Sequence, residues 1–470
     1  MIKRLFLSYF ILSFLFISAQ EKKSYKIEIK IKGLEDSVLY LASYYGDKTL
    51  LLDTAEKKGK YNYLFEGKNI LNGGIYIIAG QEKNSIFEFL ISDSQDIKFE
   101  SDLNKLVERM KVKGSNENAL FFDYLAFTNL QSTRLIEYKI NLEKYSGISD
   151  SISSLRGKIQ SIENQNIEYR ESIIEAYPEA FISELFKTMR LPTSDLQQSI
   201  KTKQDSNKFL RNYKKKYWDN FNFDDDRLLR TPIFQNKLDD YFKNIAHPEL
   251  DSLKKDIDDF FNKMNPKSEL YKHSLWYLTL MFDNSQRMGY EAILVHFADN
   301  YYRKEKADWM HPQLSKNIIE EANKRRNALI GKQAPNLIML DLDSNPVSLY
   351  AIDKSFTIVY FWDPDCQVCK VETSKLNDFY NQYAKSLNLE VFAVCTLPDL
   401  GIMKNYIAKN KLNWINVNGH HSYTNNFHEL YNIYSIPGIF ILNKEKTIIA
   451  KQLKTEQILP FIKFYQENVK

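Results

Sequence analysis

Two cysteines, Cys366 and Cys369, stand two residues apart between a strand-like run over 356–362 and a helical pattern. A helix N-terminus presents unpaired backbone N–H groups and the positive end of the helix dipole, and both favour a thiolate. The thiolate is the nucleophile of thiol–disulfide exchange, and in such settings the pKa of a cysteine falls from about 8.5 to roughly 3.5–7.5. The arrangement therefore predicts a redox-active dithiol.

The length and composition predict a folded, multidomain and exported protein. The chain has 470 residues, which suggests about three domains, and its 44% hydrophobic content suffices for packed cores. Basic Lys3 and Arg4 precede an apolar run over 5–17 and small residues up to Ala19, so we expect a secretory signal peptide over 1–19. We therefore expect an exported protein of the periplasm or cell envelope, with no later transmembrane segment.

Several other kinds of site are not expected. The net charge of +4 is small and no basic stripe with interleaved aromatic residues occurs, so we expect no nucleic-acid binding. His420, His421 and His428 cluster in the sequence without a convergent further ligand, so we expect a solvated loop and no metal site. No Gly-rich phosphate loop is present, and we expect no cofactor. The third cysteine, Cys395, lies in an apolar run and is expected to be an inert buried thiol.

Residues 20–114 predict an all-β module. The run 25–31 alternates apolar and polar side chains with period two, as a half-buried strand does. Further strand-like runs are 38–44, 61–65, 75–79 and 86–91. We expect an antiparallel sandwich or a small barrel without catalytic residues.

Residues 115–328 predict an all-α region. Apolar side chains follow a 3-4 spacing from Ile152 to Ile173, with polar Asn166 at one position of this heptad seam. A helical hairpin within the chain is the favoured explanation of the seam, and a homo-oligomer through this helical region is the alternative. Prolines should break the region into several helices, at Pro178, Pro192, Pro232, Pro248, Pro266 and Pro312.

Residues 329–470 predict an α/β fold. The expected elements are strands at 336–340, 357–361 and 389–395, helices at 367–383 and 400–409, strands at 438–442 and 447–450, and a closing helix from about Thr455. A βαβ unit followed by a hairpin and a helix fits an α/β sandwich with a central sheet.

This last region resembles the thioredoxin-like superfamily and, within it, the TlpA-type envelope thiol-disulfide oxidoreductases. The resemblance covers the C-terminal part alone, and the N-terminal β module has no assigned function. It rests on Trp362 before the two cysteines, on Lys370 and Glu372 after them, on Ile436-Pro437 before a strand, and on the opening residues 331–335. The resemblance implies a thioredoxin-like fold for 329–470.

The resemblance also implies a role for individual residues. Cys366 would be the exposed attacking thiol and Cys369 the buried resolving thiol, and oxidation would join them in a redox disulfide. Pro437 matches the family's cis-proline, which leaves the backbone of Ile436 free to pair with an extended substrate. Glu372 matches an acidic residue that accepts or relays a proton near the second cysteine, and an exposed helix carboxylate is the alternative reading.

Three features depart from a typical thioredoxin. Tyr360 stands where thioredoxins carry an Asp six residues before the first cysteine, and Gln367-Val368 replaces the usual Gly-Pro pair. Because the pair between the cysteines helps to set the redox potential, the sequence does not define that potential. Asp363 and Asp365 flank the attacking cysteine, and their negative charge opposes thiolate formation.

These observations predict a cell-envelope thiol-disulfide oxidoreductase that reduces protein disulfides. The resemblance implies disulfide-bearing protein substrates and a membrane-linked electron donor. One alternative is a binding or scaffold protein that holds Cys366 and Cys369 in a structural disulfide. Another is a peroxiredoxin-type peroxidase, which needs a Thr before the attacking cysteine where Asp363-Pro364-Asp365 stands here.

Overall fold

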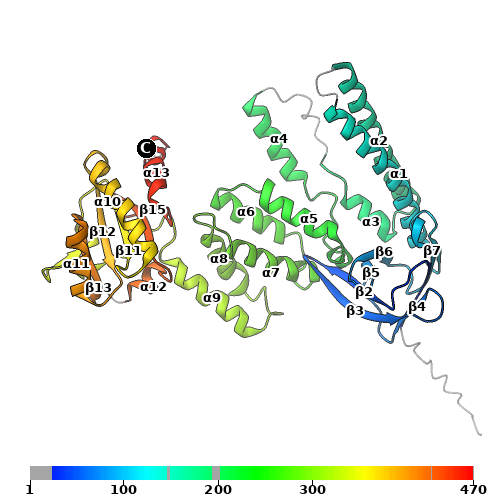
Figure 1. Cartoon of the computed structure of the whole chain (residues 1–470), viewed down its shortest axis with the longest axis horizontal. Coiled ribbons are helices and arrows are strands. Elements are labelled where there is room, and N and C mark those ends of the chain that lie inside the picture. Colours follow the sequence, from blue (N-terminus) through cyan, green and yellow to red (C-terminus); the bar gives the residue numbers. More distant parts are fainter. Residues whose placement is uncertain (1–23, 145–148, 193–201, 425, 469–470) are drawn as a thin grey trace, which may run out of the picture. The chain divides into compact units, whose positions relative to one another are not determined.

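The computed structural model describes residues 24–144, 149–192, 202–424 and 426–468 (Figure 1). The chain divides between Ile245 and Ala246 into two compact units. The predicted signal peptide over 1–19 lies outside the described residues. Within the described ranges, no helix combines the length and the apolar character that a membrane span requires.

The first unit begins with strands that form two four-stranded sheets. Its strands are β1 (Tyr25–Lys32), β2 (Val38–Tyr45), β3 (Lys48–Glu56), β4 (Asn62–Gly67), β5 (Gly74–Ala79), β6 (Ser85–Ile91), β7 (Asp96–Asp102) and β8 (Lys111–Lys113), with a short helix η1 (Leu103–Lys105). One sheet has the order β4-β1-β7-β8 and the other β3-β2-β5-β6. Alternate residues of both sheets, among them Ile27, Leu41 and Phe89, share one hydrophobic core. The predicted β module is thus confirmed as a sandwich.

The antiparallel arrangement predicted for this module is wrong at one pair of strands. β1 runs parallel to β7, with Ile27 opposite Ile97, and all four strands of the other sheet lie between β1 and β7 in the sequence. The sequence also failed to predict β3. Leu50, Leu51 and Leu52 follow one another there and are all exposed, so the period of two that marks a half-buried strand is absent.

The helices of the first unit follow the sandwich. They are α1 (Asn116–Lys144), α2 (Ser149–Ala176), α3 (Phe181–Thr188), α4 (Lys203–Lys216), η3 (Asp226–Arg230), α5 (Pro232–Asp240) and the π-helical turn η4 (Tyr241–Ile245). α1 and α2 lie side by side, with Phe127 stacked on Tyr169 at 4.5 Å between ring centroids. Ile162 and Ile173 of the heptad seam are buried, so the seam packs within the chain as the favoured explanation requires.

The second unit opens with further helices, and prolines mark their boundaries. They are α6 (Leu250–Phe261), α7 (Glu269–Asp283), α8 (Glu291–Phe297), the π-helical turn η5 (Ala298–Tyr302) and α9 (Pro312–Arg326). Pro312 starts α9, as Pro232 starts α5, because the missing proline N–H would be unpaired there in any case. The last turn of α9 is fixed by Arg326, whose guanidinium donates two hydrogen bonds of 2.7 Å to Asp299.

A seven-stranded sheet with helices on both faces completes the second unit. Its elements are β9 (Ile338–Leu340), β10 (Pro346–Ser348), η6 (Leu349–Ala351), β11 (Phe356–Trp362), α10 (Gln367–Leu387), β12 (Leu389–Cys395), α11 (Leu400–Asn410), β13 (Ile415–Ser422), α12 (Phe427–Tyr431), β14 (Gly438–Asn443), β15 (Ile448–Lys451) and α13 (Thr455–Asn468). The strand order is β10-β9-β13-β12-β11-β14-β15. This mixed α/β sheet confirms the fold predicted for the C-terminal region.

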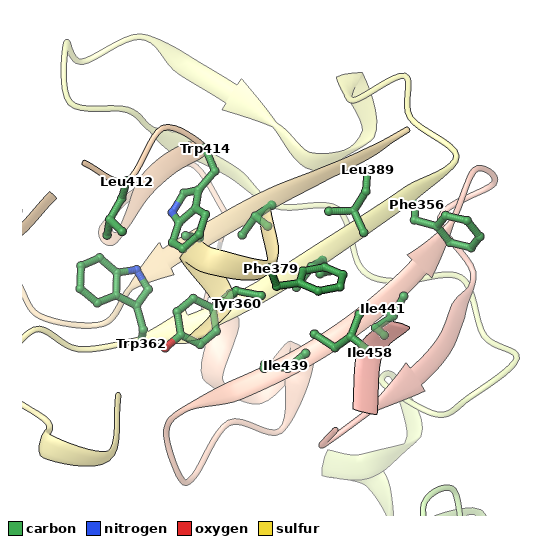
Figure 2. Close-up of a cluster of buried hydrophobic side chains, with 14 of the residues drawn as sticks. Phe356, Tyr360, Trp362, Phe379, Leu389, Leu412, Trp414, Ile439, Ile441 and Ile458 are labelled. Atoms are coloured by element: carbon green, nitrogen blue, oxygen red, sulfur yellow. The ribbon is translucent and has the colours of Figure 1, made fainter. Parts of the chain in front are cut away.

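Alternate residues of β11 supply the cores on the two faces of this sheet. Tyr360 and Trp362 point into a cluster built with α10, α11 and α13, and Figure 2 shows them with Phe379 and Ile441. Phe361 points into the opposite cluster, which α12 covers. Because both faces are buried, β11 is apolar throughout, as strands covered on both sides are.

β13 was not predicted, because its sequence is rich in Asn, Gly and His. Asn418 nevertheless lies 1% exposed in the sheet. Its Nδ2 donates a 2.8 Å hydrogen bond to the carbonyl oxygen of Leu397, which offsets the cost of burying the amide. Local propensity is therefore outweighed here by a tertiary contact.

A buried lysine joins the helices of the second unit to its sheet. Lys451, at the end of β15, is 4% exposed. Its Nζ donates a 2.9 Å hydrogen bond to the carbonyl oxygen of Ala328 and forms an ion pair with Glu291 of α8. Its backbone N–H also meets the sulfur of Met288 at 3.5 Å. Loss of one partner would leave a buried charge uncompensated, so these contacts hold the α8–α9 segment against the sheet.

Two glycine-to-alanine substitutions in the first unit should have opposite effects on stability. Gly114 has φ +87°, and a Cβ there would lie 2.1 Å from the carbonyl oxygen of Asp96. Gly114→Ala should therefore lower the free energy of unfolding by about 2 kcal/mol or more. Gly157, within α2, has nothing within 4 Å of such a Cβ, so Gly157→Ala should raise it by about 0.5–1 kcal/mol.

Urea unfolding of the full chain, followed by circular dichroism, measures both effects. Equal changes in the free energy of unfolding of the two variants would contradict the positive φ and the close contact assigned to Gly114.

Candidate active site

The end of β11 brings Cys366 to the N-terminus of α10. In the turn between them, the N–H of Cys366 donates to the carbonyl oxygen of Asp363 at 3.2 Å, and the N–H of Asp365 donates to the Asp363 carboxylate at 2.7 Å. Cys366 is the N-cap of α10, and its Sγ accepts a 3.2 Å hydrogen bond from the N–H of Cys369. The sulfur thus takes up an otherwise unpaired N–H group at the positive end of the helix dipole.

The two thiols differ in exposure, and burial changes the acidity of Cys369. Both are free cysteines, with Cys366 half-buried and Cys369 fully buried. Burial raises the pKa of the Cys369 thiol to about 12, and its contact with the Cys366 sulfur contributes in the same direction. Cys369 therefore carries its proton at neutral pH. The arrangement offers one accessible sulfur with a second, protonated sulfur directly beneath it.

Two residues of β11 support this turn of α10 from below. Trp362 is 1% exposed, and its ring lies 5.2 Å from that of Tyr406. The hydroxyl of Tyr360 lies 2.8 Å from Oγ1 of Thr373 and donates a 3.4 Å hydrogen bond to the carbonyl oxygen of Cys369. Tyr360 thus replaces the carboxylate that thioredoxins place here with a neutral group.

Tyr360 and Thr373 act on the site in a way that the sequence interpretation missed. They position the first turn of α10 through the hydrogen bonds just described. The sequence feature that could have revealed this role is a tyrosine inside an otherwise apolar strand, because a buried hydroxyl group needs a hydrogen-bond partner.

Pro437 lies beside the end of β11. Gly438 pairs with Phe361 in the antiparallel β11–β14 ladder, which places Pro437 next to Trp362. The Ile436–Pro437 peptide bond is cis. Ile436 packs against the same hydrophobic cluster as Cys366. The structure thus brings the two cysteines, Trp362, Ile436 and Pro437 to one end of the central strand.

Glu372 has a contact that neither sequence interpretation included. Its side chain is half-buried, and its carboxylate accepts hydrogen bonds from the backbone N–H of Thr455 at 2.7 Å and from the Thr455 hydroxyl at 2.6 Å. The alternative reading of Glu372 as an exposed helix carboxylate is therefore wrong. The carboxylate takes up an N–H group at the first residue of α13 and so joins α10 to α13.

The remaining cysteine and the histidines lie in separate environments. Cys395 pairs with Trp362 in the sheet and is fully buried, and burial raises the pKa of its thiol to about 12. His420 and His428 each face a backbone carbonyl oxygen, of Thr396 at 3.0 Å and of Ile433 at 3.1 Å. Over the described ranges, no group of three or more His, Cys, Asp or Glu side chains could hold a metal ion.

Alkylation should distinguish the three thiols by exposure and by pH. With iodoacetamide at neutral pH, Cys366 should be the single cysteine that reacts in the folded chain. In a Cys366→Ser variant, alkylation of Cys369 should rise about tenfold per pH unit from about pH 8 to about pH 11, because its thiolate fraction grows until the pKa is reached.

Peptide mapping by mass spectrometry reads both results. The urea-unfolded chain, in which all three cysteines should react alike, is the control. A plateau for Cys369 near pH 9 would contradict the burial of its thiol.

A Glu372→Ala substitution should weaken the docking of α13. Loss of the two hydrogen bonds to Thr455 should lower the free energy of unfolding by about 0.5–2 kcal/mol. The matched control is Glu456→Ala, because the ion pair of Glu456 on α13 with Lys375, at 2.5 Å, is exposed to solvent and contributes little to stability. Thermal unfolding measures the difference, and an equal, small effect in both variants would argue against a capping role.

Comparison with known proteins identifies three segments of the chain. Residues 330–451 match the AhpC/TSA family. Residues 25–121 and 158–325 match two domains of unknown function, DUF4369 and DUF5106.

Curated relatives match the C-terminal segment. A thiol-disulfide oxidoreductase ResA of Bacillus cereus is 24% identical over 150 residues, which is 31% of this chain and 82% of that protein. The ResA of Bacillus thuringiensis is 24% identical over 143 residues, which is 30% of this chain and 78% of that protein.

Solved structures are similar to the chain as well. A domain of a possible thiol-disulfide isomerase from Cytophaga hutchinsonii is 32% identical, with a TM-score of 0.29, and the match covers 30% of this chain and 95% of that one. A thioredoxin-like protein from Bacteroides caccae is 21% identical, with a TM-score of 0.45, and the match covers 59% of this chain and 98% of that one. From the sheet, the cysteine turn and the matches to curated sequences, we conclude that this chain carries a thioredoxin-like domain of the AhpC/TSA family, similar to the thiol-disulfide oxidoreductases.

Proposed function

We propose that this protein is a thiol-disulfide oxidoreductase of the cell envelope that reduces protein disulfides through Cys366 and Cys369. One observation carries the proposal. The half-buried sulfur of Cys366 caps α10 and accepts the N–H of Cys369, whose own thiol is buried directly beneath it. The names of the curated ResA relatives support the same activity.

The reaction takes two exchange steps. The Cys366 thiolate attacks one sulfur of a substrate disulfide; the substrate S–S bond breaks, a mixed disulfide forms, and the other substrate sulfur leaves as a thiolate. Cys369 then loses its proton and attacks the Cys366 sulfur, which releases the second substrate thiolate and leaves a Cys366–Cys369 disulfide. The substrate gains two electrons, the dithiol loses two, and the released thiolates take up protons from Cys369 and from water.

The surroundings of the two sulfurs fit these roles. The helix dipole and the N–H of Cys369 stabilise the negative charge of the Cys366 thiolate before it attacks. Because the pKa of Cys369 is about 12, its proton must be removed as it attacks. Glu372 stands three residues further along α10, and we propose it as the acceptor of that proton.

The proposed cell-envelope location is supported by another part of the chain, and the proposed partners follow from that location. The basic and apolar pattern over 1–19 is that of a secretory signal peptide, so we place the protein in the periplasm or cell envelope. There the oxidised dithiol must regain two electrons for each substrate. We propose a membrane-linked electron donor for this step, and disulfide-bearing proteins as substrates.

The AhpC/TSA match favours a peroxiredoxin-type peroxidase as the second candidate. In that reaction Cys366 would attack the peroxide oxygen, release water or an alcohol, and become a sulfenic acid that Cys369 resolves. The sequence Asp363-Pro364-Asp365 supplies no Thr before the attacking cysteine. The two activities therefore have to be separated by assay.

Replacing each cysteine should affect disulfide reduction differently. With dithiothreitol as reductant and insulin as substrate, Cys366→Ser should lower the rate at least about a thousandfold, because the nucleophile is lost. Cys369→Ser should accumulate a mixed disulfide between Cys366 and an insulin chain, which non-reducing electrophoresis detects. Cys395→Ser is the matched control and should keep activity within about twofold, because Cys395 is buried in the β12 strand.

Three outcomes would overturn the proposal. Full insulin reduction by Cys366→Ser would remove Cys366 from the mechanism. Rapid peroxide consumption by a wild type that is inactive on insulin would establish the peroxidase. A Cys366–Cys369 pair that stays oxidised in excess dithiothreitol would identify a structural disulfide in a binding or scaffold protein.

A further inference from the structure

An exposed aromatic side chain stands in the turn that leads into the active site. Tyr434 is 64% exposed, although Ile433 just before it and Ile436 two residues after it pack into the cores of the sheet. Tyr434 lies three residues before Pro437, which the β11–β14 register places beside Trp362, at the end of the strand that leads to Cys366. A large exposed ring beside a reactive group is a common feature of binding surfaces.

A second element, from outside the sheet, holds this ring. Lys324 of α9 places its Nζ over the Tyr434 ring, 5.6 Å from the centroid. The same ammonium group lies 3.4 Å from the Glu321 carboxylate one turn earlier. A cation over an aromatic face restricts the ring and leaves its remaining surface free.

The lysine itself is carried on a rigid part of α9. Its neighbours Arg325 and Arg326 are ion-paired with Asp283 and Asp299, at 2.5 Å and 2.7 Å. Beyond the helix, the carbonyl oxygen of Ala328 accepts from buried Lys451, so the chain is fixed on both sides of Lys324. The cation–π contact therefore favours one orientation of the Tyr434 ring, which lowers the conformational entropy that a bound segment would cost.

We propose that Tyr434, positioned by Lys324, is a specificity-determining residue that binds the polypeptide beside the substrate disulfide. The expected ligand is an extended segment with an apolar or aromatic side chain near its cystine. Val368, which lies between the two cysteines and is 65% exposed, adds a second apolar side chain near the attacking sulfur. This inference rests on the proposed function, and it gives helix α9 of the helical region a part in substrate selection.

The test compares a protein disulfide with a small one in the full chain. The probes are insulin and the small aromatic disulfide dithiobis-nitrobenzoate. In Tyr434→Ala, the ratio of kcat/KM for insulin to the rate constant for the small disulfide should fall roughly three- to tenfold. The fall should come from a higher KM for insulin, because one aromatic contact is lost. Tyr434→Phe should retain the wild-type ratio. Tyr423→Ala, the matched control at a tyrosine that is 72% exposed, should retain it too.

The lysine is tested by a double-mutant cycle. Lys324→Ala should lower the same ratio about twofold, and adding it to Tyr434→Ala should cause no further loss, because Lys324 acts through the ring. An additive loss would mean that Lys324 binds substrate independently, which overturns its positioning role.

The remaining outcomes separate this inference from the proposed function. An active wild type whose ratio is unchanged in a folded Tyr434→Ala variant would overturn the inference alone. An equal fall in Tyr423→Ala would also overturn it. A wild type that reduces neither probe would overturn the proposed function and the inference with it.

Discussion

The burial of β11 on both faces is the constraint on which the site depends. All seven residues from Phe356 to Trp362 are buried, and the strand pairs with β12 on one side and β14 on the other. A strand fixed in this way can end in one place only, so the turn after it must bring Cys366 to the start of α10. The same register places Pro437 beside Trp362. Packing of apolar side chains therefore determines where the polar chemistry takes place.

The chemical difference between the two cysteines comes from a single helical turn. Cys366 lies outside the helix as its N-cap, whereas Cys369 lies one turn in, on the face that packs against the sheet. Three residues further along an α-helix, a side chain points to nearly the same side again but lies about 4.5 Å further along the helix axis. That displacement is enough to change a half-solvated sulfur into a buried one with a raised pKa. No charged neighbour is needed to set the order of attack.

Prediction from the sequence was most successful where the local pattern of apolar residues agreed with the burial of those residues in the folded chain. The strands at 356–362 and 389–395 and the helix after Cys366 were predicted because apolar runs and glycine or proline breaks coincide with burial. β13 and β3 were missed for opposite reasons: β13 buries polar side chains such as Asn418, and β3 exposes leucines such as Leu51. The Glu372–Thr455 contact joins residues far apart in the chain, so no local pattern contains it. Long-range polar partners are the part of the site that required the structure.

Buried Lys451 has a consequence for how the second unit folds. Its acceptors, Glu291 and the Ala328 carbonyl, both precede the first strand of the seven-stranded sheet. A fragment that began at β9 would lack both of these partners and the helical segment that covers the ammonium group. We therefore expect the smallest stretch that unfolds and refolds cooperatively to include α8 and the residues that follow α9. In thermodynamic terms, the edge of the redox domain lies inside the helical region rather than at the point where strands begin.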